Sequence, residues 1–99
     1  MRIRSRLLDV VNVTLAVRVH HPDITWVYFH REVAWPAVPR TGEVLVVDYH
    51  DYPVAVREIS WDLDGRARID LPDLEPEAAA EADEFINRLD AAGWQRGNV

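Results

Sequence analysis

The sequence predicts a small α+β domain, in which a strongly bent antiparallel sheet of about five strands is followed by one C-terminal amphipathic helix. Residues 11–71 place apolar side chains at alternate positions, in short runs separated by turn residues. Residues 74–92 place them at helical spacing instead. Because the strand pattern precedes the helical pattern and does not alternate with it, the order favours α+β over a parallel α/β sheet.

The first two strands are predicted to form a hairpin. Residues 11–19 alternate cleanly between apolar side chains and smaller or polar ones, as a half-buried strand does. Residues 21–23, with the sequence His-Pro-Asp, favour a turn because proline fixes φ and aspartate caps nearby backbone groups. The extended pattern resumes over residues 25–35, where Arg31 falls among the apolar side chains and makes the pattern imperfect.

Burial should select one register for this hairpin. Setting Val19 opposite Val27 gathers the apolar side chains on one face, whereas a slip of one residue would mix the two faces. On the other face Arg18 then lies opposite Tyr28, where the two side chains could make a cation–π contact. We name the side chains of that face the aromatic strip, whose members are Arg18, His20, Trp26, Tyr28 and His30.

Three shorter strands are predicted to follow as a meander, over residues 44–48, 54–61 and 66–71. The prolines of residues 36–39 mark the preceding connection as a loop or sheet edge, since proline cannot donate to a strand ladder. Gly65 favours a tight turn before the last strand because glycine readily adopts a positive φ. A sheet bent this strongly could close into a small SH3-like barrel.

The helix is predicted over residues 74–92, with Pro76 in its first turn. Its apolar stripe lies opposite an acidic face, which includes Glu77, Glu81 and Glu84. Gly93 is predicted to end the helix in a left-handed conformation, with Trp94 covering Leu89 as in a Schellman motif. Residues 96–99 are expected to fray.

Length and composition favour a single domain over residues 1–99, with mobile ends. A chain of 99 residues buries a modest core, and without cysteine it has neither disulfides nor thiolate metal ligands. The basic start lacks the apolar core of a secretory signal, and no apolar run approaches the roughly 18 residues that a membrane span needs. We therefore expect a cytoplasmic protein that does not contact membranes.

The net charge of −6 is concentrated in the predicted helix. Residues 73–92 contain seven acidic residues and one arginine, while residues 1–72 contain ten acidic residues and nine arginines. Such a balance argues against sequence-independent binding of nucleic acid, which needs a basic surface. The triplet Arg2, Arg4 and Arg6 is best explained as a solvated chain end.

No catalytic or metal-binding motif is evident in the sequence. The two serines lie outside any nucleophile elbow, and the four glycines do not have the spacing of a phosphate-binding loop. The four histidines are suitable ligand types, but they form neither an HxH nor an HExxH pattern. We therefore expect no catalytic residue, no metal and no cofactor; the histidines concerned are His20, His21, His30 and His50.

The aromatic strip is the main candidate for a functional surface, since Trp, Tyr and Arg are enriched at binding hot spots. The sequence thus predicts a small non-catalytic interaction or accessory module, whose protein partner binds the strip. Pairing of an open strand edge with a second copy would give a homodimer. The competing expectation is that the C-terminal helix buries its apolar stripe against the aromatic strip.

Two other functions stay open. The acidic face of Glu77, Glu81 and Glu84 could imitate a row of phosphates, as in an inhibitor or nucleic-acid mimic encoded by a phage or another mobile element. A solvated helix surface explains the same charges more simply. A metal-dependent enzyme would require His20, His30 and His50 to converge on one ion, which the spacing does not favour.

Overall fold

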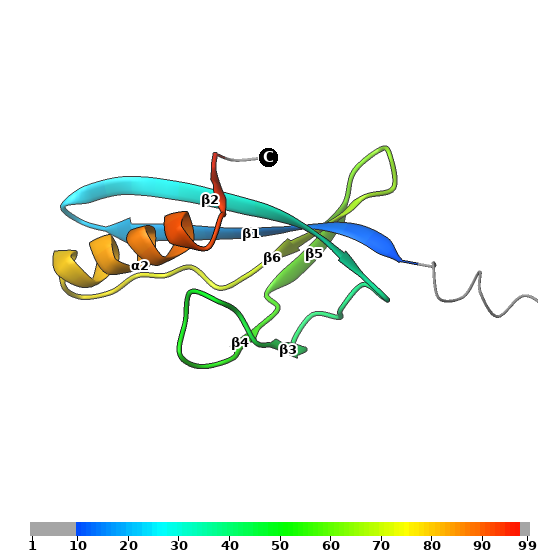
Figure 1. The fold of residues 1–99 in the computed structure, drawn as a ribbon, viewed down its shortest axis with the longest axis horizontal. Helices are drawn as coiled ribbons and strands as arrows, with labels where there is room; N and C mark the ends of the chain where they lie inside the picture. Colours follow the sequence, from blue (N-terminus) through cyan, green and yellow to red (C-terminus); the bar gives the residue numbers. More distant parts are fainter. Residues whose placement is uncertain (1–9, 98–99) are drawn as a thin grey trace, which may run out of the picture.

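A computed structural model describes residues 10–97 and has the predicted α+β class (Figure 1). Five strands form one mixed sheet in the order β5-β6-β1-β2-β7, and β3 and β4 form a separate two-stranded sheet. The elements are β1 (Val11–His21), β2 (Ile24–Trp35), β3 (Val44–Leu45), β4 (Val54–Ala55), β5 (Glu58–Trp61), β6 (Ala67–Asp70), α2 (Ala79–Ala91) and β7 (Gln95–Arg96).

The sheet differs from the predicted one in direction and closure. β6 runs parallel to β1, with Val13 beside Ala67 and Ala16 beside Asp70, so the sheet is mixed and not antiparallel throughout. β5 and β7 end the strand order without pairing with each other, so no SH3-like barrel forms. The reason is the path of residues 36–57, which carries the chain from β2 across to the far side of β1 before the β5–β6 hairpin begins (Figure 1).

The predicted register of the β1–β2 hairpin is confirmed. Val19 pairs with Val27, and Arg18 pairs with Tyr28. β1 continues to His21, beyond its predicted end, and a bulge interrupts the register between Val19 and His21. The apolar face of the hairpin is therefore the one that the alternation of the sequence selects.

The predicted strand over residues 54–61 is divided in two. The backbone N–H of Val56 donates to the carbonyl of Glu43 at 2.8 Å, whereas that of Arg57 donates to the carbonyl of Asp70 at 2.9 Å. The chain thus changes partner between these neighbours, leaving β4 with β3 and β5 with β6. Hydrogen bonding to two different segments explains why one run of alternating residues gives two short strands.

The helix α2 packs on the apolar face of the hairpin. Ala82 and Leu89 of α2 are completely buried in one cluster with Val17, Val19 and Phe29. Residues 36–57 cover the same face farther along, with side chains that include Tyr49 and Val56. Among residues 10–97 no helix is long and apolar enough to cross a membrane.

The helix begins at Ala79, later than the predicted start at residue 74. Residues 71–74 instead extend along β1: the N–H of Leu74 donates to the carbonyl of Arg18 at 2.8 Å, and the N–H of His20 donates to the carbonyl of Leu74 at 2.9 Å. Pro76 adds a local reason, because the residue before a proline disfavours helical backbone angles. Pairing with β1 therefore delays the helix.

The predicted end of the helix is confirmed. Gly93 adopts a φ of +88°, its N–H donates to the carbonyl of Asp90, and the N–H of Trp94 donates to the carbonyl of Leu89, which is the Schellman pattern. The expectation of fraying is wrong for Arg96, which lies in β7 and pairs with Phe29 of β2.

An ion pair explains how the charged side chain of Arg31 is accommodated on the apolar face of the hairpin. Its Nη1 lies 2.5 Å from Oδ2 of Asp48. The other oxygen of Asp48 accepts a hydrogen bond from Nε1 of the buried Trp94 at 2.9 Å. One carboxylate thus satisfies both a guanidinium and an indole at the border of the core.

Candidate functional site

The aromatic strip lies on the face of the sheet opposite α2. Because residues alternate along a strand, the neighbours of the buried valines of β1 point away from the core. The side chains of the strip are partly exposed, whereas α2 contributes to the cluster on the other face. The competing expectation that α2 covers the strip is therefore wrong. We call this side of the sheet the open face.

Trp26 is the centre of the strip. Its ring stacks on His20 with the ring centroids 4.3 Å apart and the planes inclined by 17°. The guanidinium carbon of Arg18 lies 4.6 Å from the centroid of the same ring. The sequence predicted a cation–π contact between Arg18 and Tyr28; the structure instead gives Trp26 as its aromatic partner, although Tyr28 is the residue directly opposite.

Asp73 holds Arg18 in this position. Nε of Arg18 donates to Oδ1 of Asp73 at 2.8 Å, and Nη2 donates to Oδ2 at 2.7 Å, so the pair is bidentate. The hydrogen bonds that Arg18 donates to the Asp73 carboxylate raise the pKa of Arg18. The sequence analysis did not identify this role of Asp73, which depends on residues 71–74 running beside β1.

His30 differs from the rest of the strip because its ring is bound by the C-terminal segment. Nδ1 lies 2.9 Å from the carbonyl oxygen of Gly97, and Nε2 lies 3.1 Å from Oε1 of Gln95. Both contacts follow from the pairing of β7 with β2. The side chains of the strip that remain for a partner are Arg18, His20, Trp26 and Tyr28.

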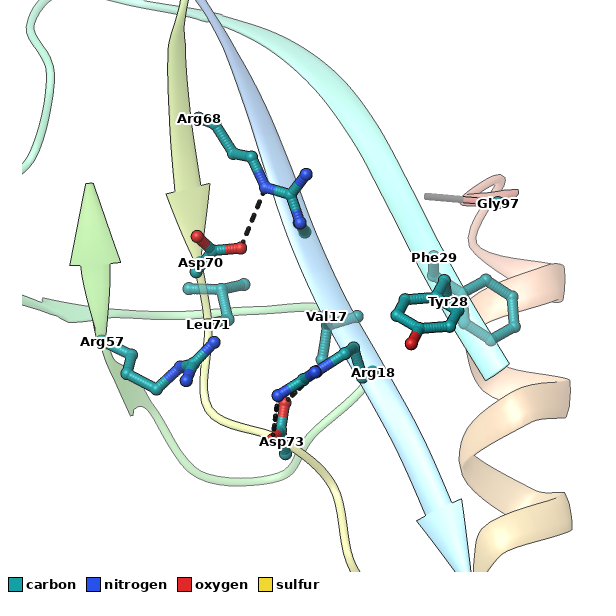
Figure 2. Close-up of a pocket in the computed structure, with 11 residues that line it drawn as sticks. Val17, Arg18, Tyr28, Phe29, Arg57, Arg68, Asp70, Leu71, Asp73 and Gly97 are labelled. Atoms are coloured by element: carbon teal, nitrogen blue, oxygen red, sulfur yellow. Dashed lines mark hydrogen bonds and ion pairs between the residues drawn. The ribbon is translucent and has the colours of Figure 1, made fainter. Parts of the chain in front are cut away.

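A second group of charged side chains surrounds a small pocket beside the strip (Figure 2). We name it the arginine pocket and define it by Arg18, Tyr28, Arg57, Arg68, Asp70 and Asp73. Its cavity volume is about 10 Å³, close to the space that one water molecule occupies. Arg68 and Asp70 share a face of β6 because side chains alternate along a strand, but their place beside β1 depends on the parallel pairing of β6.

The acidic face is solvent-exposed, as expected for an outer helix surface. Glu81 and Glu84 lie on α2, and Glu77 precedes it. The backbone carbonyl of Glu77 lies 2.9 Å from Nε2 of His21. This contact joins the start of the helix to the hairpin turn, a structural role that is independent of the three carboxylates.

The histidines do not converge in the described part of the chain. His20 and His30 lie on the open face, whereas the ring of His50 stacks on Phe85 of α2 with the centroids 5.7 Å apart. Over residues 10–97, no group of three or more His, Cys, Asp or Glu side chains has an arrangement that could hold a metal ion. The described geometry thus offers no support for a metal-dependent reaction.

Exposed apolar side chains gather at the β5–β6 turn, a feature that the sequence analysis did not single out. Trp61 is 62% exposed, and Leu63 is fully exposed. Trp61 and Val11 line an open cavity of about 400 Å³. Alternation alone could not distinguish Trp61 from a core residue, because its exposure results from the edge position of β5.

Comparison with protein-family models, with curated proteins and with solved structures gave no match. The functional argument therefore rests on the geometry of the open face.

Proposed function

We propose that this protein is a small non-catalytic interaction module whose protein partner binds the open face at Arg18, Trp26 and Tyr28. These residue types dominate the energy of protein interfaces, because each combines a large contact area with a polar group. They lie together on two neighbouring strands, on the side of the sheet that α2 leaves uncovered.

The observation that carries the proposal is the stack of Arg18, Trp26 and His20. Ordering a flexible side chain at an interface costs about 0.5–1.5 kcal/mol. Here Asp73 fixes Arg18 through two hydrogen bonds, and Arg18 and His20 both contact the ring of Trp26. A partner would therefore meet side chains that are already ordered, which favours binding.

Replacing Trp26 and Tyr28 together with alanine tests the proposal. Affinity capture from native host extract, followed by mass spectrometry, identifies the partner of the unmodified protein. We expect the variant to fail to capture this partner. Calorimetry on the purified pair then confirms the interaction. The loss of folding stability should stay below the roughly 3–5 kcal/mol that truncation of a fully buried aromatic side chain costs, because both rings are partly exposed.

The matched control is the Tyr52→Ala/Trp61→Ala variant, since both of these aromatic side chains are largely exposed away from the strip. It should retain the partner. If both double variants bind it equally, or if Trp26→Ala/Tyr28→Ala unfolds the protein, the open face is not the binding surface.

The acidic inhibitor or mimic stays the second candidate, supported by the exposure of Glu77, Glu81 and Glu84. The Glu77→Arg/Glu81→Arg/Glu84→Arg variant in the same capture experiment separates the two functions. The homodimer likewise stays a proposal, supported by the outer edge of β5, which has no neighbour in the described sheet.

A further inference from the structure

Among the described residues, the arginine pocket is lined by more arginine side chains than carboxylates. Arg18 is paired with Asp73, and Nε of Arg68 donates to Oδ1 of Asp70 at 3.0 Å. Arg57 lines the same pocket and is exposed, but its side chain makes no hydrogen bond or ion pair within residues 10–97. Within residues 10–97, three guanidinium groups and two carboxylates therefore line the pocket.

Arg57 and Arg18 are directed toward the same space. Arg57 comes from the connection between β4 and β5, whereas Arg18 comes from β1, and Figure 2 shows the guanidinium of Arg57 reaching toward the Arg18–Asp73 pair. Both oxygens of Asp73 accept a hydrogen bond from Arg18, and neither accepts one from Arg57. The arrangement leaves donors of Arg57 directed into the pocket with no acceptor from the described chain.

We propose that Arg57, with Arg18 beside it, binds one carboxylate group of the partner protein, supplied by an aspartate or glutamate side chain. The inference rests on the proposed function, since the pocket opens on the same face as the aromatic strip. A guanidinium donates in a planar fork that matches a carboxylate, and charge-assisted hydrogen bonds of this kind are about twice as strong as neutral ones.

The charge and size of the pocket favour a monoanionic group over a phosphate or a small molecule. The described lining residues carry an excess of one positive charge, and Asp70 and Asp73 would repel a dianion more strongly than a monoanion. A cavity of about 10 Å³ has room for about one ligand oxygen, whereas small-molecule sites usually enclose at least about 300 Å³. The pocket therefore fits the end of a side chain that approaches from outside.

The neighbouring aromatic residues define the rest of the partner's motif. Tyr28 lines the pocket with its hydroxyl on the side of Arg18 (Figure 2), and Trp26 contacts Arg18 directly. An acidic residue of the partner that occupies the pocket would place its chain neighbours over these rings. We infer a partner segment in which an acidic side chain is next to an apolar one.

Nuclear magnetic resonance on the full chain tests the inference with a defined probe. Capped tripeptides Ala-Glu-Ala and Ala-Gln-Ala, which differ only in the carboxylate, are titrated at constant ionic strength while the arginine Nε–Hε signals are followed. We expect the Glu peptide to shift the signals of Arg57 and Arg18 saturably, whereas the Gln peptide should not shift them.

Arg57→Gln should weaken the Glu peptide about tenfold or more, since a hydrogen bond to a charged group contributes about 1.5–3 kcal/mol. The control is Arg40→Gln, because Arg40 is also exposed and also has no side-chain partner within residues 10–97. The Arg40→Gln variant should bind the Glu peptide with the same affinity as the unmodified protein.

An unchanged affinity in Arg57→Gln, equal binding of the two peptides, or no saturable shift with the Glu peptide would overturn the carboxylate site. Tighter binding of inorganic phosphate than of the Glu peptide would overturn the choice of ligand. Capture of the protein partner is a separate measurement, so failure of the pocket and failure of the aromatic strip are distinguishable.

Discussion

Tyr49 illustrates at the residue scale how burial changes the chemistry of one side chain. The residue is completely buried, and its ring packs edge-on against Trp94 at a centroid distance of 5.4 Å. The hydroxyl makes no hydrogen bond to any described part of the chain. Burial raises the pKa of Tyr49 strongly, and the nearby negative charge of Asp48 raises it further.

The raised pKa predicts a specific loss of stability at alkaline pH. Unfolded Tyr49 ionises near pH 10, but the folded residue does not, so its contribution is complete below about pH 10 and is lost as the pH rises toward the folded pKa. The free energy of unfolding should fall by about 1.4 kcal/mol per pH unit from this one group. Urea denaturation at a series of increasing pH values measures how steeply the free energy of unfolding falls with pH.

Tyr49→Phe should lack this part of the slope and should be at least as stable as the unmodified protein at neutral pH, because it removes a buried hydroxyl without a partner. Tyr52→Phe is the control, since Tyr52 is 73% exposed, and it should keep the full slope. Identical alkaline slopes in all three proteins would show that Tyr49 ionises freely in the folded state.

At the scale of the elements, His21 connects the hairpin turn to the start of the helix. Its ring is almost buried. The N–H of Asp23 donates to Nδ1 at 3.1 Å, which leaves Nε2 to donate to the carbonyl of Glu77 at 2.9 Å. One imidazole thus satisfies a turn amide and a carbonyl that precedes α2, two groups that are far apart in the sequence.

His21→Ala should lower the free energy of unfolding by about 2 kcal/mol, because two partly buried hydrogen bonds of about 1 kcal/mol each are lost. Urea denaturation at neutral pH measures the difference. His20→Ala is the matched control on the neighbouring residue, and its cost should be smaller because the His20 side chain is 30% exposed. Equal costs would mean that the connection does not stabilise the fold.

At the scale of the whole molecule, the helix and the long connection after β2 lie on one side of the sheet in the described part of the chain. The helix, Trp94 and the segment of residues 36–56 share one core with the apolar face of β1 and β2. β1 is the centre of this arrangement, since it pairs with β2 on one side and β6 on the other. The opposite side is consequently left to the aromatic strip and the arginine pocket.

This arrangement predicts a gradient of amide hydrogen exchange. The hydrogen-bonded amides of β1 should exchange slowest, through global unfolding, because both edges of the strand are paired and its apolar side chains are buried. The two-residue strands β3 and β4 should exchange much faster, through local opening. Exchange measured by nuclear magnetic resonance would contradict the arrangement if β3 and β4 were protected as strongly as β1.

Several parts of the fold could be predicted because their causes are local. The alternation around Val17 and Val19 determined the hairpin register, and the Gly93–Trp94 pair determined the end of the helix. The start of the helix was predicted wrongly because a distant strand competes for the backbone of Leu74. The predicted strand over residues 54–61 is likewise divided after Val56 because segments distant in the sequence compete for its backbone hydrogen bonds.

The candidate surface was predictable only in part. Periodicity along β1 and β2 placed Arg18 and Trp26 on one face, since side chains alternate with a period of two residues. It could not select Trp26 over Tyr28 as the ring beneath Arg18. It also gave no sign that Arg57, Arg68 and Asp73 would surround the same pocket, because these residues reach β1 only through the path of residues 36–57.

The sequence by itself determined the α+β class, the pairing of the long hairpin and which of its faces is apolar, because periodicity and turn chemistry act over a few neighbouring residues. Only the tertiary structure decided that β6 lies parallel to β1, that the helix covers the apolar face, and that three arginines meet on the other side. These outcomes depend on contacts between segments distant in the chain, whose free energies no local pattern records.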